Sequence, residues 1–186
     1  WSGGSSHTAV IPASNFAKDG QYTISISGKD LAGNTLKPVT SSFTVDKKKP
    51  EIKITGVSSA NNGEVAPVIN ITDDNLDAQD VKVYKNGKLL SSSVEKDGDV
   101  VSYNLTDGKR ITGKWATDNY EKGIKKKMIF DNFPTEEEYD GSYRIDVESK
   151  DMAENENSES LDFSVNRFGS VFSIENADEI NGKYLN

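Results

Sequence analysis

The chain has few of the residues on which catalytic and cross-linked proteins depend. Its 186 residues include no cysteine and a single histidine, His7. The absence of cysteine excludes a disulfide framework, a thiolate metal site and a cysteine nucleophile. Nucleophilic catalysis needs a base beside the nucleophile, and His7 follows a Ser- and Gly-rich stretch at residues 2–6, where we expect an exposed loop. We therefore predict that the chain is not an enzyme and has no catalytic, cofactor-binding or metal-binding residues.

Positive charge and long apolar runs are also scarce. The 30 acidic residues outnumber the 22 lysines and arginines, which gives a net charge of −8. A nucleic-acid-binding protein needs a basic face, so this balance argues against such a partner. No apolar run approaches the roughly 18 residues of a membrane span, and no signal peptide is recognisable. Because the sequence begins with Trp1 rather than methionine, we expect an internal fragment of a longer protein.

What the sequence does contain is an internal repeat. Residues 19–34 read DGQYTISISGKDLAGN and residues 140–155 read DGSYRIDVESKDMAEN, with eight of 16 aligned positions identical. Each segment is followed by a Phe-x-Val pair, at Phe43 and at Phe163. The offset is 121 residues at the start and 120 at the end, so we predict modules of about 120 residues.

This module length divides the chain. Residues 50–166 are expected to form one complete module, and residues 1–46 the C-terminal part of a first, truncated module. Residues 47–49 form a charged linker that ends at Pro50, which suits the entry to a first strand because proline cannot donate to a sheet. Residues 167–186 are expected to begin a following module or to form a tail.

Alternating polarity predicts β-strands throughout. Tyr22, Ile24 and Ile26 alternate with polar residues, as does the matching run over residues 143–147. Further strands are predicted by the same logic at residues 52–54, 67–72, 81–84, 100–105, 109–115, 124–130 and 161–165. No stretch has convincing helical spacing over three turns.

Two dipeptides predict hairpins between these strands. Asn86-Gly87 is a strong signal because both central residues of a tight hairpin turn need a positive φ, and Asp107-Gly108 is a second signal of this kind. Many short strands with regular turns indicate a sandwich or a barrel. The predicted fold class is all-β.

These segments resemble the bacterial immunoglobulin-like repeats of large extracellular proteins. Modules of that family have an Asp-Gly-x-Tyr strand start, an Asp-x-Ala-Gly-Asn hairpin and a closing Phe-x-Val-Asp strand. The first copy matches fully, while the second has Glu154 in place of the glycine and Asn166 in place of the last aspartate. We therefore expect a less ideal second turn, or a left-handed Asn155 in it. The resemblance spans residues 16–166 and implies an immunoglobulin-like β-sandwich in tandem modules, the first one truncated.

The resemblance also implies a function. It suggests a non-enzymatic structural or adhesion module, a stalk or spacer, of an exported bacterial cell-surface protein, with neighbouring immunoglobulin-like modules of the same chain as partners. The location would be extracellular. The alternative is a module that binds a carbohydrate or a host ligand and is appended to a surface enzyme, with a glycan or a host protein as partner. Modules of this kind sometimes contain a lysine–asparagine isopeptide cross-link, which needs a buried Lys, Asn and acid together.

An aromatic platform would favour the carbohydrate alternative. Trp115, Tyr120 and Tyr139 are the candidates for such a platform. Trp115 alternates with Gly113 and Ile111, which favours a place in the core instead. These residues belong to a surplus between Asn86-Gly87 and Asp140, because the module is longer than the usual ~100 residues. We expect an inserted hairpin or an extended sheet edge there.

The acidic run at residues 73–77 was compared with a calcium loop. With Asp73 at position 1 of an EF-hand, position 6 is Ala78 and position 12 is Tyr84, so both the turn glycine and the bidentate glutamate are missing. Asx turns at a strand end are therefore favoured. A weaker calcium site, completed by carboxylates from another loop, stays open as the alternative.

Tyr143 suggests one further detail of the core. In immunoglobulin-type sandwiches, a tyrosine near the start of the sixth strand hydrogen-bonds to upstream backbone, two residues before a cysteine. Tyr143 fits that position, with Ile145 in place of the cysteine. We predict the same tyrosine corner over a core without a disulfide.

Overall fold

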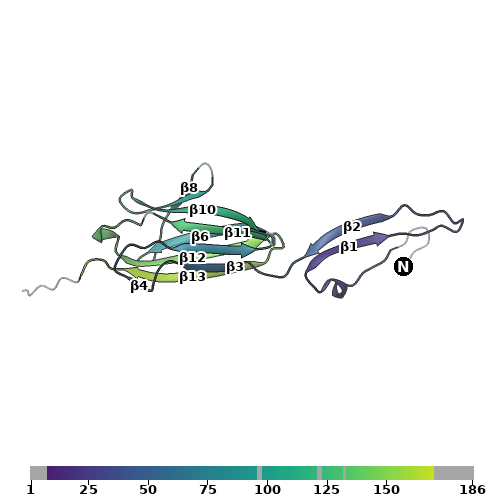
Figure 1. Cartoon of the computed structure of the whole chain (residues 1–186), viewed down its shortest axis with the longest axis horizontal. Helices are drawn as coiled ribbons and strands as arrows, with labels where there is room; N and C mark the ends of the chain where they lie inside the picture. The colour runs from purple at the N-terminus through teal and green to yellow at the C-terminus, as the bar shows by residue number, and fades with distance from the viewer. Residues whose placement is uncertain (1–7, 96–97, 121–122, 132, 170–186) are drawn as a thin grey trace, which may run out of the picture.

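The computed structural model describes residues 8–95, 98–120, 123–131 and 133–169. Strands dominate this part of the chain, which confirms the all-β prediction (Figure 1). Each predicted run overlaps an observed strand. Among the described residues, no helix has the length and apolar character needed to cross a membrane.

The first part of the chain is a two-stranded hairpin. Strands β1 (Gly20–Ile26) and β2 (Val39–Val45) pair antiparallel after a short 3-10 helix, η1 (Ala13–Phe16). The hairpin extends from one end of the main body (Figure 1). Its apolar residues stay in contact with solvent, with Val39 61% and Phe43 37% exposed. No second sheet covers it within the described residues.

The main body consists of two sheets. The six-stranded sheet has the order β3 (Glu51–Thr55), β5 (Val68–Asp73), β11 (Gly123–Phe130), β10 (Arg110–Tyr120), β9 (Val100–Asn104) and β8 (Ser92–Val94). The five-stranded sheet has the order β4 (Ala60–Asn61), β13 (Glu156–Val165), β12 (Gly141–Asp151), β6 (Leu76–Lys85) and β7 (Lys88–Leu89). Neighbouring strands are antiparallel except for β4 and β13. A 3-10 turn, η2 (Glu137–Tyr139), precedes β12.

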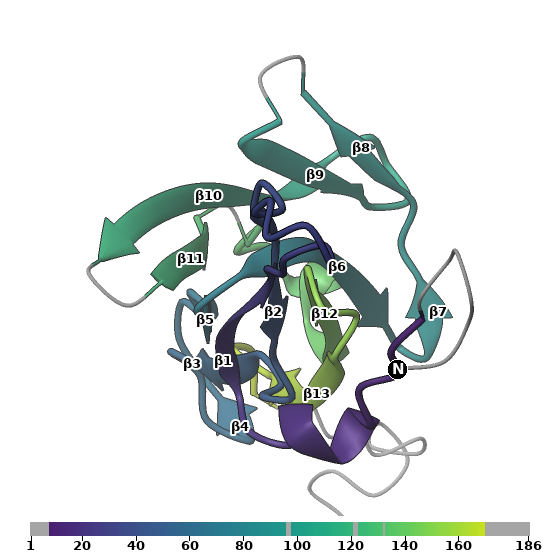
Figure 2. The same ribbon diagram turned by 90° about the vertical axis from the view of Figure 1, so that its right-hand side faces the viewer.

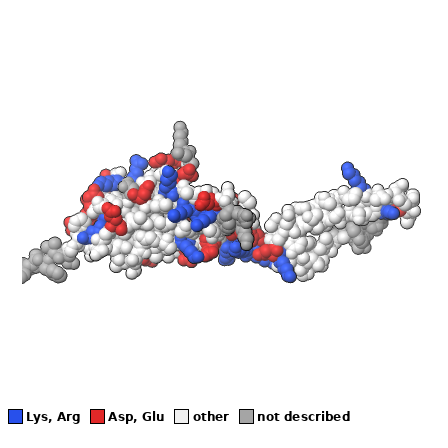
Figure 3. Space-filling view, viewed as in Figure 1, with Lys and Arg blue, Asp and Glu red and all other residues white. Residues whose placement is uncertain are grey.

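The two sheets pack into a β-sandwich, which Figure 2 shows along the long axis of the molecule. Alternation along each strand explains the core. On β5, Ile69 and Ile71 are fully buried while Asn70 between them is partly exposed. Ile145 and Val147 of β12 belong to the same apolar cluster. Lysine, arginine and acidic residues are interspersed over the sandwich surface in Figure 3, whereas few charges mark the hairpin on that face.

The predicted tyrosine corner is present. The buried hydroxyl of Tyr143 donates a hydrogen bond to the backbone carbonyl of Tyr139, and Ile145 is fully buried at the position where antibody domains have cysteine. Apolar packing therefore replaces the disulfide at this position.

The structure also describes the two predicted turns and most of the surplus segment. Asn86 (φ 49°) and Gly87 (φ 76°) form the predicted hairpin turn between β6 and β7. In the turn between β9 and β10, Gly108 has a positive φ of 85°. The surplus extends the edge of the six-stranded sheet, because β8 and β9 follow β10 there.

Candidate functional site

The end of the sandwich that continues into the hairpin gathers three aspartates from distant parts of the chain. Asp46 follows β2, Asp73 is the last residue of β5, and Asp151 is the last residue of β12. One carboxylate oxygen from each residue lies within 4.8 Å of those of the other two. Asp73 and Asp151 are each 1% exposed, and Asp46 is partly buried. We call these three residues the junction cluster, because Asp46 begins the connection between hairpin and sandwich.

Asp73 ends β5 in an Asx turn. Its Oδ1 accepts a hydrogen bond from the backbone N–H of Asn75 at 2.7 Å, as the sequence predicted for this strand end. Its Oδ2 is buried and has no hydrogen-bond partner among the described residues. Burial raises the pKa of Asp73, the hydrogen bond from Asn75 opposes this, and the charges of Asp151 and Asp46 raise it further.

Asp151 organises the hairpin between β12 and β13. Its Oδ1 accepts hydrogen bonds from the backbone N–H groups of Ala153 at 2.8 Å and Asn155 at 2.9 Å. Its Oδ2 accepts one from the side-chain amide of Asn155 at 2.7 Å. In the first hairpin, Asn34 donates to Asp30 in the same way, from its backbone at 2.8 Å and its side chain at 2.7 Å. The same aspartate–asparagine contact therefore shapes both hairpins.

The turn that follows Asp151 agrees with one of the two expectations, a less ideal turn, and not with the other. The missing glycine suggested a left-handed Asn155, but Glu154 itself adopts a φ of 67°. Gly33 occupies the corresponding position in the first hairpin, with a φ of 89°. The expectation for Asn155 is wrong because its backbone and its side chain both bind Asp151, which holds its place in the turn.

Asparagine side chains tie the connection to the sandwich. The Nδ2 of Asn75 donates to Asp46 Oδ2 at 3.0 Å, and the Nδ2 of Asn155 donates to the backbone carbonyl of Asp46 at 3.1 Å. Farther along, the Nδ2 of Asn157 donates to the backbone carbonyl of Pro50 at 2.8 Å. Both ends of the connection are thus held by the sandwich.

The junction cluster offers only oxygen ligands. None of the ion pairs among the described residues involves one of its three carboxylates. Carboxylate oxygens without sulfur or imidazole suit a hard cation such as Ca²⁺ or Mg²⁺. The sequence indicated Asp73 through its acidic run. It did not indicate which distant loops would join it, although Asp46 and Asp151 belong to the two repeated motifs.

Among the described residues, Trp115 and Tyr139 do not come together as an aromatic platform. Trp115 is partly buried and packs against the core on the same side as Ile111, as its alternation predicted. Tyr139 is 4% exposed, its hydroxyl donates to Asp107, and its ring makes no contact with that of Trp115. The side chain of Tyr120 lies outside the described residues.

The remaining sequence candidates do not form a second site within the part of the chain that the structure describes. His7 lies outside the described residues. The glutamates at 136–138 are exposed, and Glu136 forms an ion pair with Lys109. No described lysine is buried, so the described residues do not bring together the buried Lys, Asn and acid of an isopeptide cross-link.

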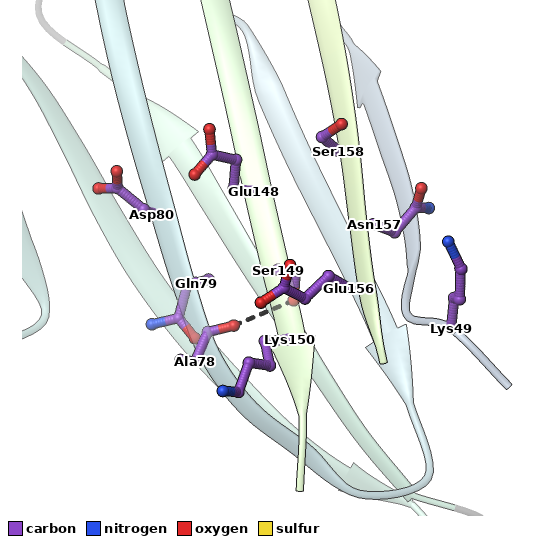
Figure 4. A pocket seen from close by; sticks show the side chains of 10 residues that line it. All are labelled: Lys49, Ala78, Gln79, Asp80, Glu148, Ser149, Lys150, Glu156, Asn157 and Ser158. Atoms are coloured by element: carbon purple, nitrogen blue, oxygen red, sulfur yellow. Dashed lines mark hydrogen bonds between the residues drawn. The ribbon is translucent and has the colours of Figure 1, made fainter. Parts of the chain in front are cut away.

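A polar groove lies beside the junction on the outer face of the five-stranded sheet (Figure 4). It has a volume of about 590 Å³ and is lined by residues of β6, β12 and β13 and by Lys49 of the connection. Both charge signs are present, for example in Lys150 and Glu148. Ser149 at its floor donates to the backbone carbonyl of Ala78 at 3.1 Å. No aromatic side chain lines the groove, so it has no stacking surface for a sugar ring.

Comparisons with known proteins do not assign the chain to a family. No family model matches the sequence, and no curated protein matches it. Among solved structures, it is similar to a DUF4426 family protein from Pseudomonas aeruginosa at 14% identity, over 64% of this chain and 91% of that one. The TM-score is 0.28, which is too low to support an argument about fold or function.

Proposed function

We propose that the chain is a non-catalytic structural or adhesion segment, a stalk or spacer of consecutive immunoglobulin-like modules in an exported bacterial cell-surface protein. The likeness of the two hairpins carries this proposal. Tyr22 pairs with Phe43 in β1–β2 as Tyr143 pairs with Phe163 in β12–β13. The stacked rings have centroids 5.6 Å and 5.5 Å apart. The recurrence of one element after a fixed interval is typical of modules in a row.

The strand order supports the immunoglobulin-like part of the proposal. In such sandwiches, the first, second, fifth and fourth strands share one sheet, and the third, sixth and seventh share the other. The orders β3-β5-β11-β10 and β6-β12-β13 correspond to this arrangement. Strands β8 and β9 are then additions to one edge.

The anchored connection supports the role of a spacer. A flexible linker would leave two neighbouring modules free to reorient, whereas Asn75 and Asn155 hold Asp46 in place through their amides. A fixed connection transmits direction and length along a row of modules. A stalk needs such a connection to hold its modules in a fixed orientation.

Small-angle X-ray scattering of the whole chain tests this role. The double variant Asn75→Ala/Asn155→Ala removes both amide contacts to Asp46. We therefore expect its distribution of interatomic distances to be broader than that of the unmodified chain. Asn62→Ala, at an exposed position of the sandwich, is the matched control and is expected to scatter like the unmodified chain. If the double variant also scatters like the unmodified chain, the connection is not held by these contacts and the spacer role loses its support.

A carbohydrate- or host-ligand-binding module is the second candidate, favoured by the polar groove beside the junction. A screen against glycans and cell-wall polysaccharides, with Glu148→Ala and Trp115→Phe in parallel, tests it. Binding that is lost in Glu148→Ala places a ligand in the groove, and binding lost in Trp115→Phe places it at the extended sheet edge. No binding by the folded chain supports the spacer.

A further inference from the structure

Asp73 is the starting point, because one of its two carboxylate oxygens is buried but has no hydrogen bond to any residue that the structure describes. Its Oδ1 is engaged by Asn75, but its Oδ2 has no partner among the described residues. A buried carboxylate oxygen without a hydrogen bond is costly, so native structures normally satisfy it. One carboxylate oxygen from each of Asp46, Asp73 and Asp151 lies within 4.8 Å of those of the other two residues.

Three carboxylates this close repel one another unless a positive charge lies between them. No ion pair among the described residues supplies that charge to any of the three. The amides of Asn75 and Asn155 contribute dipoles, which orient Asp46 and Asp151 but leave their net charge in place. The junction cluster therefore has the ligands of a cation-binding site, and hydrogen bonds already orient their oxygens.

We propose that Asp46, Asp73 and Asp151 bind one Ca²⁺ ion at the junction of hairpin and sandwich. The proposal does not depend on the spacer function, since it concerns binding at a defined set of oxygens.

The spacing of the oxygens is compatible with calcium. Ca²⁺ binds oxygen at 2.3–2.6 Å, so two ligands on opposite sides of the ion are about 4.6–5.2 Å apart. The oxygens of the junction cluster fall within this reach. Mg²⁺ binds at 2.0–2.1 Å, demands near-octahedral geometry and usually keeps several waters. Carboxylates from three separate segments of the chain suit the larger ion, which tolerates more varied geometry.

The hydrogen bonds that the cluster already accepts are compatible with a bound ion. Each carboxylate oxygen has two lone pairs, so Oδ2 of Asp151, which accepts one bond from the side chain of Asn155, still has a lone pair for the ion. Three carboxylates do not fill the six to eight positions of Ca²⁺, and water completes the shell. We therefore expect a Kd of about 10⁻⁵ to 10⁻³ M, in the range of sensor and extracellular sites.

Binding would link the two parts of the chain directly. Asp46 belongs to the connection that leaves β2, whereas Asp73 and Asp151 belong to the two sheets of the sandwich. An ion shared by all three adds a bond between connection and sandwich that the amides alone do not provide. Calcium would in this way make the junction stiffer.

Calorimetric titration of the whole 186-residue chain, stripped with EGTA and desalted, tests the proposal. We expect CaCl2 to bind with a stoichiometry of one, and MgCl2 to bind at least tenfold more weakly. Asp73→Asn is expected to lower calcium affinity at least tenfold. Asp74→Asn is the matched control: the neighbouring aspartate is exposed, lies outside the cluster and loses the same charge, so its affinity should stay within twofold.

Thermal melting provides the second readout and checks that each variant folds. Calcium should raise the melting temperature of the unmodified chain and of Asp74→Asn, but not that of Asp73→Asn. Should Asp73→Asn fail to fold, Asp46→Asn replaces it, because Asp46 is only partly buried and the chain has asparagine at the corresponding position 166. The proposal is overturned if the folded chain binds no calcium up to about 5 mM, above the weakest protein sites of this type. It is equally overturned if Asp74→Asn weakens binding as much as Asp73→Asn does.

Discussion

Glu154 holds a backbone conformation that residues with a side chain avoid. Its φ is 67°, in a turn where the first hairpin uses Gly33. The left-handed region costs such a residue about 1–2 kcal/mol, because Cβ approaches the following carbonyl oxygen. We predict that Glu154→Gly raises the free energy of unfolding by about 0.5–1 kcal/mol in urea denaturation, since the entropy of glycine offsets part of the relief. The ion pair that it gives up, with Lys150 at 3.7 Å, is exposed and contributes little.

Met152 is the matched control for this prediction. It is exposed in the same turn and has no positive φ, so Met152→Gly gains only the flexibility of glycine and should lower the free energy of unfolding. A Glu154→Gly chain that is less stable than the unmodified one would show that the turn stores no strain at this residue.

The tyrosine corner depends on a single hydroxyl group. Tyr143 donates to the backbone carbonyl of Tyr139, and burial raises the pKa of Tyr143 to about 12, against the opposing charge of Arg167. The hydroxyl is therefore a proton donor throughout the neutral range. Tyr143→Phe leaves that carbonyl without its partner, and we predict a loss of about 1–2 kcal/mol in urea denaturation. The partly exposed Tyr84 of β6 supplies the control, and Tyr84→Phe should change stability by less than about 0.5 kcal/mol.

At the scale of elements, the sequence predicted what local patterns determine. Alternation located the long strands, since a half-buried strand must alternate over several residues. Asn86-Gly87 located its turn because the two residues adopt positive φ readily. The strands β4, β7 and β8 were missed, because two or three residues carry no alternation. The partner of β4 is β13, about a hundred residues later, and only tertiary packing can bring them together.

The candidate site shows the same limit at the ends of the strands. Asp73 was recognised as part of an acidic run, and its Asx turn followed from local chemistry. The proximity of Asp73 to Asp46 and Asp151 depends instead on tertiary structure. Strands β5 and β12 finish at the same end of the sandwich, where the connection from β2 enters. The sequence alone therefore indicates candidate aspartates, but only the fold shows which of them lie together.

At Gly123, the neighbouring backbone leaves no room for a side chain. It begins β11 with a φ of 148°, and a Cβ there would lie 2.3 Å from the carbonyl oxygen of Asp73 and 2.6 Å from the Cα of Asp74. Because both atoms belong to backbone, neither can rotate away. We predict that Gly123→Ala lowers the free energy of unfolding by about 2–3 kcal/mol in urea denaturation, through strain and the displacement of the end of β5.

Gly108 is the control that separates backbone strain from the steric clash. It also has a positive φ, 85°, but no atom lies within 4 Å of a Cβ placed there. Gly108→Ala should therefore cost about 1 kcal/mol, the strain alone. Equal losses in Gly108→Ala and Gly123→Ala would mean that the contact with Asp73 relaxes without cost.

At the scale of the whole molecule, the sandwich has a buried apolar core and the hairpin does not. All of the buried apolar residues of the described chain lie in or between strands β3 to β13. The hairpin buries none, and it leaves Val39 and Phe43 in contact with solvent. A two-stranded hairpin alone is marginally stable at best in water. The sandwich therefore has the core that an independent folding unit needs, and the hairpin does not.

Removal of residues 1–46 tests this division. The remaining chain keeps every buried apolar residue and loses the contacts of Asn75 and Asn155 with Asp46, so we predict a cooperative thermal melt close to that of the whole chain. A peptide of residues 8–46 is expected to show no cooperative melt. Because Asp46 is absent, calcium should no longer raise the melting temperature of the shortened chain. Loss of the cooperative melt would show that the hairpin belongs to the folding unit of the sandwich. A calcium effect that persists at full size would place the ion away from Asp46.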